Sequence, residues 1–170
     1  MPEQSIIAYL GVLENSFRGK AWQGPTLLGS LRGISPRQAV VVPAGLRHSI
    51  WHLVLHATYW KYAGCLRLQR AGVRVAPLGG AAASFERSPS NWPALPTPAD
   101  ERAWRADIAL LKSWHDAVRR AAASVPPRSL DMVPPGGRTV TPRMVLIGLA
   151  AHDAYHTGQI QLLKKLTNRR

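Results

Sequence analysis

The chain has 170 residues, 46% hydrophobic and 18% charged, which is the composition of one globular domain spanning residues 1–170. It has no apolar run of the roughly 18 residues that cross a membrane, no signal-peptide pattern, and one cysteine, Cys65, which excludes an internal disulfide and favours a cytoplasmic location. The 22 Lys and Arg against 9 Asp and Glu give a net charge of +13, but the basic residues are dispersed, which favours a solvated basic surface over a nucleic-acid-binding site.

The first half of the chain contains two predicted helices. Residues 3–18 form the first, and the stretch 21–40 holds short helical turns at most. The second helix covers roughly residues 45–70. It is followed by a Gly-, Pro- and Ser-rich loop, 72–97, whose length indicates a functional or partly disordered segment.

The second half contains two more predicted helices that begin with the same pair of residues. Thr97 as N-cap and Pro98 in the first helical position start a helix over about 98–124. Thr141 and the proline after it start another over about 142–167. No segment alternates at a period of two, so the fold class is all-α, and four long helices predict an antiparallel four-helix bundle.

Two histidines occupy the apolar face of the last predicted helix. At about 100° per residue, His152 and His156 lie in the middle of a stripe of aliphatic side chains: Val145, Leu149, Ile160 and Leu163. Residues four apart on a helix are neighbours, so the two imidazoles can share one ion. Gln159 is placed either to orient a ligand or substrate or to satisfy a buried backbone group. Five polar residues are predicted on the opposite, solvent-facing side: Asp153, Thr157, Gln161, Lys164 and Lys165.

The second predicted helix contributes one further inward histidine. His56 lies about 40° from Trp60 on the apolar face, whereas His52 is about 80° and His48 about 160° away. We therefore expect His48 to cap the helix or face solvent. In the third helix, His115 shares the apolar face and is predicted to be buried.

Histidines converging from two helices indicate a metal site. Buried imidazoles need partners for both ring nitrogens, and neutral imidazole is a ligand for Zn, Ni, Cu and Fe. The set His56, His152 and His156 is therefore predicted to bind one divalent ion, with neither His52 nor His115 as a ligand. Because "HDAYH" has Asp153 in place of the glutamate of HExxH, the motif argues against a zinc protease of that type.

Three stretches resemble the DinB-like (YfiT-like) metalloenzymes: "AWQGPTLLGSL", "HSIWHLVLHATYW" and "HDAYHTGQIQLL". The last is the most specific, since the final helix of that family typically ends in H-x-x-x-H followed by Gly-Gln-Ile. The resemblance implies an antiparallel four-helix bundle that binds one zinc or nickel ion through His56, His152 and His156. His52 stands where relatives often have an acidic residue. Relatives include thiol transferases, lyases and hydrolases, and are often homodimers.

These observations favour a metal-dependent enzyme, a thiol-dependent transferase or hydrolase. Its substrate is expected to be a small anionic molecule such as a low-molecular-weight thiol or a carboxylate, and no catalytic residue is assigned. The alternatives are a non-catalytic, stress-related metal-binding protein whose closed site includes His115, and a nucleic-acid-binding protein. Cys65 and Tyr155 are interpreted as packing residues, as are the tryptophans. The 72–97 loop is expected to cover the open end of the bundle near the histidines.

Overall fold

The computed structural model describes residues 2–70, 85–87, 91–134 and 139–168, and within these ranges all regular elements are helical. The prediction of an all-α fold is confirmed. The four long helices are α1 (Pro2–Phe17), α4 (Ile50–Arg70), α5 (Glu101–Ala123) and α6 (Pro142–Thr167). The short ones are α2 (Leu27–Ser30), α3 (Pro36–Ala39) and the 3-10 turn η1 (Pro127–Ser129). None of the helices in the described ranges is long and apolar enough to cross a membrane.

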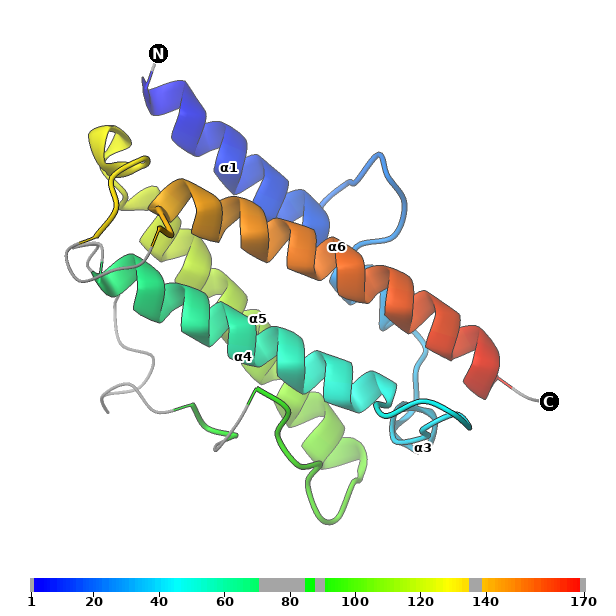
Figure 1. Cartoon of the computed structure of the whole chain (residues 1–170). Helices are drawn as coiled ribbons and strands as arrows, with labels where there is room; N and C mark the ends of the chain where they lie inside the picture. The colour runs from blue at the N-terminus through cyan, green and yellow to red at the C-terminus, as the bar shows by residue number, and fades with distance from the viewer. Residues whose placement is uncertain (1, 71–84, 88–90, 135–138, 169–170) are drawn as a thin grey trace.

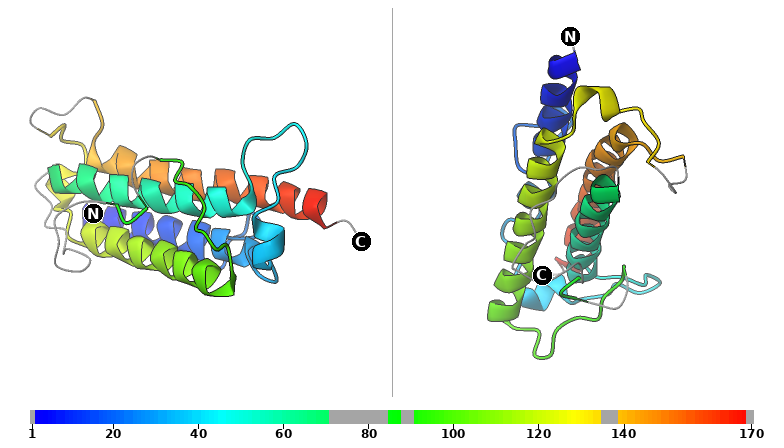
Figure 2. Two further views of the ribbon diagram at one scale, coloured as in Figure 1. Left: turned by 90° about the horizontal axis from the view of Figure 1, so that it is seen from below. Right: turned by 90° about the vertical axis from the view of Figure 1, so that its left-hand side faces the viewer.

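The four long helices lie side by side in a ring, in which α1 and α4 each contact both α5 and α6 (Figure 1). Helices α1 and α6 run in one direction and α4 and α5 in the other, as the colour gradients in Figures 1 and 2 show. The pairs α1–α5 and α4–α6 are thus antiparallel, but α4 and α5 are parallel neighbours. Because 21 helical residues span about 31 Å, the chain after α4 must return along the bundle before α5 begins. This topology requires the long connection that the sequence shows.

The predicted helix start was correct for α6 and wrong for α5. Thr141 caps α6, with its hydroxyl accepting a hydrogen bond from the Met144 amide at 3.3 Å. Helix α5 begins only at Glu101, and its cap is Asp100, whose carboxylate accepts from the Ala103 amide at 2.8 Å. A carboxylate at this position also interacts favourably with the helix dipole, which a threonine hydroxyl does not. Asp100 therefore replaces Thr97 as the start of the helix.

Helix α6 is buried on two sides because it packs against α4 on one and α1 on the other. Asp153 and Thr157, predicted to face solvent, are only 1% and 5% exposed. The Lys61 ammonium, itself 1% exposed, donates to both Asp153 oxygens at 2.6 and 2.8 Å. A helical wheel identifies the buried face of a helix by its apolar residues. It therefore misses the second buried face of α6, which contains Asp153 and Thr157. The other three residues of the predicted polar side are partly or fully exposed: Gln161, Lys164 and Lys165.

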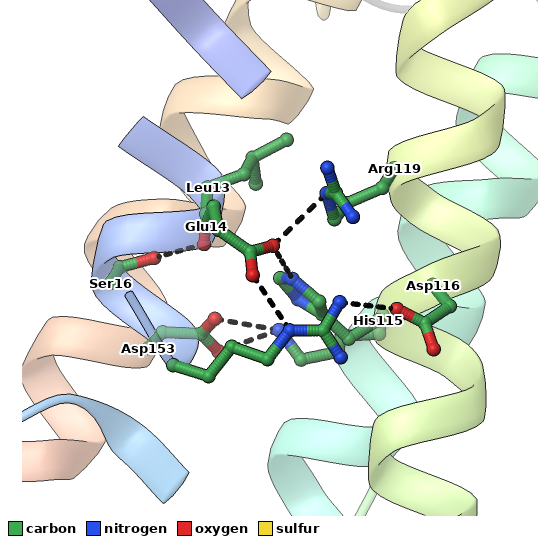
Figure 3. A network of polar contacts seen from close by, with 9 residues as sticks. Leu13, Glu14, Ser16, His115, Asp116, Arg119 and Asp153 are labelled. Carbon is green, nitrogen blue, oxygen red and sulfur yellow. Dashed lines mark hydrogen bonds and ion pairs between the residues drawn. The ribbon is translucent and has the colours of Figure 1, made fainter. Parts of the chain in front are cut away.

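A second polar cluster lies between α1 and α5 (Figure 3). Glu14 accepts hydrogen bonds from Arg18 at 2.7 Å and from His115 Nε2 at 3.4 Å. It also forms an ion pair with Arg119 at 3.0 Å. His115 is fully buried, as predicted, and its ring stacks on Phe17 with a centroid distance of 3.7 Å. Burial lowers the pKa of His115 to about 2, so the ring is neutral at physiological pH.

The core contains three of the six tryptophans, Trp51, Trp104 and Trp114. The interpretation of the tryptophans as core residues is wrong for Trp22, which precedes α2 and is 97% exposed. Cys65 is 3% exposed, and burial raises the pKa of its thiol to about 12. It behaves as the small buried hydrophobe that the sequence predicts.

Candidate metal centre

The three predicted histidines meet in the groove between α4 and α6. His152 Nε2 lies 3.3 Å from His56 Nε2 and 3.0 Å from His156 Nε2. The three rings offer nitrogens that all lie within 4.8 Å of one another. His152 and His156 come from successive turns of α6, and His56 comes from the antiparallel neighbour α4. The packing of two helices thus assembles the cluster.

In two of the three histidines, a hydrogen bond from the ring nitrogen that points away from the cluster determines which nitrogen faces its centre. His56 Nδ1 donates to the backbone carbonyl of Asn91 at 2.7 Å, and His156 Nδ1 donates to the Gln159 amide oxygen at 2.6 Å. Since an Nδ1 that donates must carry the proton, each of these rings presents an unprotonated Nε2. Gln159 therefore orients a candidate ligand, one of the two roles proposed for it from the sequence. The Asn91 carbonyl could not be identified from the sequence.

All three imidazoles are held in the neutral form that binds metals. Burial lowers the pKa of His152 to about 3 and that of His156 to about 4, and the His56 pKa is also lowered, mainly by burial. The neighbouring histidines add to the shifts of His152 and His156, because a proton on one ring disfavours a proton on the next. At neutral pH at least two lone pairs thus point at a common centre.

The geometry of the cluster fits a divalent ion. A tetrahedral zinc site with Zn–N bonds of about 2.0–2.1 Å separates its ligand nitrogens by about 3.3–3.4 Å, close to the observed 3.0 and 3.3 Å. A single proton on His152 Nε2 can bond to only one of the two facing lone pairs, whereas a cation attracts all three. His52 Nδ1 lies 2.9 Å from the Ser49 hydroxyl, and His115 contacts Glu14, so neither joins the group.

A model of the DinB superfamily matches residues 22–160, a range that includes all three histidines. The chain belongs to the DinB superfamily. No curated protein and no solved structure matches it significantly. The family resemblance seen in the three sequence stretches is thereby confirmed.

In this DinB-superfamily chain, the connection between α4 and α5 reaches the histidines. The Trp92 ring lies between those of His48 and His56, stacked on each, with centroid distances of 3.7 and 3.8 Å. His48 precedes α4 and is half-buried by this contact, so it neither caps the helix nor faces solvent freely. The prediction that loop 72–97 covers the histidines is confirmed for Asn91 and Trp92; residues 72–84 and 88–90 lie outside the described ranges.

The candidate centre of this family member lies in a pocket with a volume of about 760 Å³, open between α4 and α6. This volume is within the range of small-molecule sites. The walls are largely apolar, and among the described residues of the lining only Arg47 and Arg67 are charged. Tyr155, interpreted as a packing residue, is 64% exposed and lines this pocket, with its ring centroid 5.0 Å from that of His156. It lies on the face of α6 turned towards the opening.

Proposed function

We propose that this protein is a metal-dependent enzyme in which His56, His152 and His156 hold one divalent ion, zinc or nickel. The observation that carries the proposal is the convergence of the three Nε2 atoms. Hydrogen bonds from Nδ1 to Asn91 and Gln159 turn the Nε2 lone pairs of His56 and His156 towards the centre. Metal-binding histidines commonly donate their other ring N–H in this way. The inward-facing Nε2 lone pairs still need a common acceptor of their electrons, and a divalent ion at the centre of the cluster supplies it.

An open site supports catalysis over a purely structural metal. Three histidines leave a coordination position for water or substrate, and here the cluster borders the pocket. A bound divalent ion acts as a Lewis acid that lowers the pKa of a bound water or thiol. The alternative of a closed structural site required His115 as a fourth ligand, but that ring is engaged by Phe17 and Glu14.

The residues that line the pocket determine what the protein itself contributes to the proposed catalysis. The imidazoles hold the ion, Gln159 and the Asn91 carbonyl orient them, and the apolar walls exclude water. No carboxylate lines the pocket, so within the described residues there is no acidic general base next to the histidines. This supports a transferase or hydrolase whose nucleophile, a water or a low-molecular-weight thiol, becomes reactive through the ion.

Metal analysis tests the proposal directly. Protein purified without a metal-affinity tag is expected to contain about one zinc or nickel per chain by elemental analysis. Single replacements His56→Ala, His152→Ala and His156→Ala should each strongly lower metal affinity, and Gln159→Leu should lower it by about 10–100-fold. The matched control is His52→Ala, on the same helix one turn before His56. Stoichiometric tight binding in all three ligand variants would refute the proposal.

A further inference from the structure

One half of the pocket extends from the histidines along α4 and α6 to Arg67. The α4 side of this stretch is formed by Trp60, Gly64 and Arg67, which lie on one face at helical spacing. The α6 side is aliphatic: Met144, Val145 and Leu149, with Gly148 between them. The stretch therefore has an apolar body, a metal-binding cluster at one end and a cation at the other.

Arg67 is held in place while its charge stays unneutralised. Its guanidinium carbon lies 5.1 Å from the Trp60 ring centroid, a cation–π contact. Within the described part of the chain it forms no ion pair. Other arginines do form such pairs with carboxylates: Arg18, Arg87, Arg105, Arg119 and Arg143. Arg67 is therefore available to an anion that enters the pocket.

The distance from Arg67 to the histidines sets the size of such an anion. The Trp60 centroid is 5.1 Å from the guanidinium carbon and 5.7 Å from the His152 ring centroid, so the two ends lie no more than about 11 Å apart. An amino-acid-sized or aryl-acid-sized molecule spans this distance. A methyl group added at Gly148 would meet no atom within 4 Å, which shows that open space lies above this position.

We infer that the pocket binds an organic acid with an apolar body, whose carboxylate pairs with Arg67 and whose opposite end faces the three histidines. A guanidinium offers parallel N–H donors to both oxygens of a carboxylate. The indole of Trp60 and the aliphatic wall of α6 favour an aromatic or acyl body over a sugar or a polyphosphate. The position of the reacting end rests on the proposed function; the carboxylate site does not.

Titration calorimetry of the chelator-treated, metal-free protein tests the carboxylate site. Phenylbutyrate and phenylbutanol share one apolar body and differ in charge. The acid is expected to bind at least about tenfold more tightly than the alcohol, because only the acid pairs with Arg67. Arg67→Met should remove this preference and leave alcohol binding unchanged. Arg47→Met, which removes the other charge among the described lining residues, should keep the preference.

A second variant tests the apolar body independently of charge. Gly148→Leu fills the open space, should weaken both ligands, and replaces a helical glycine with a better helix former, so the fold is retained. Equal binding of acid and alcohol, a preference that survives Arg67→Met, or unchanged binding by Gly148→Leu would each overturn the inference. Zinc and nickel titrations of the same proteins separate the two proposals, since acid binding without metal binding supports the carboxylate site and refutes the proposed function.

Discussion

Removal of the buried cation Lys61 should destabilise the protein far more than removal of a surface cation. In Lys61→Met, the Asp153 carboxyl group stays in a site that is 1% exposed and loses its partner at 2.6–2.8 Å. Burial already raises the pKa of Asp153 despite Lys61. Breaking such a pair costs about 3–5 kcal/mol. At about 2–4 °C per kcal/mol for a chain of this size, the Tm should fall by roughly 6–20 °C.

Urea and thermal unfolding followed by circular dichroism measure this loss. In the double variant Lys61→Met with Asp153→Leu most of the stability should return, because apolar side chains of similar volume remove both desolvated charges. The control is Arg105→Met, which breaks the exposed pair with Glu101 and should cost less than about 1 kcal/mol. A loss below about 1 kcal/mol in Lys61→Met, or additive losses in the double variant, would show that the pair is not buried as described.

Three further outcomes are expected. Because the pKa of His115 is lowered to about 2, the unfolded chain binds a proton at His115 below pH ~6.5 that the folded chain does not. His115 alone should therefore lower the free energy of unfolding by up to about 1.4 kcal/mol per pH unit as the pH drops from there, in addition to what His152 and His156 contribute, and His115→Phe should remove this share of the slope in urea titrations at several pH values. Cys65 should not react with a thiol reagent at pH 8 until urea unfolds the chain, since burial raises its pKa to about 12. Asp100→Ala should cost about 1 kcal/mol by urea unfolding and Thr97→Ala almost nothing, because only Asp100 caps α5.

The helices and the three histidines could be predicted because both follow from local periodicity. A pair of histidines at i, i+4 in an apolar stripe has a direction that the helix alone determines, and the same geometry on α4 points His56 inward. These residues come from regular elements, where the spacing along the sequence translates directly into a position in space. The N-cap Thr141 is predictable for the same reason, since an N-cap acts within one turn of its helix.

What could not be predicted depends on contacts between distant segments. A charged residue such as Asp153 is normally found at the surface. It can be buried here because it pairs with Lys61, which lies 92 positions away in the sequence. The stacking of Trp92 between His48 and His56 depends on how the α4–α5 connection returns along the bundle. Tyr155 has the sequence character of a core residue, yet it lies beside an opening that exists only between two packed helices.

The contact between His56 and Asn91 is made by a main-chain oxygen, and this affects how the site can evolve. Any residue at position 91 supplies the same carbonyl, so the side chain there is free to change while the histidine stays oriented. Gln159 performs the equivalent task for His156 with its side chain, and a substitution there removes the acceptor. Among relatives with this site, position 159 should therefore vary little and position 91 widely, although both support the same centre.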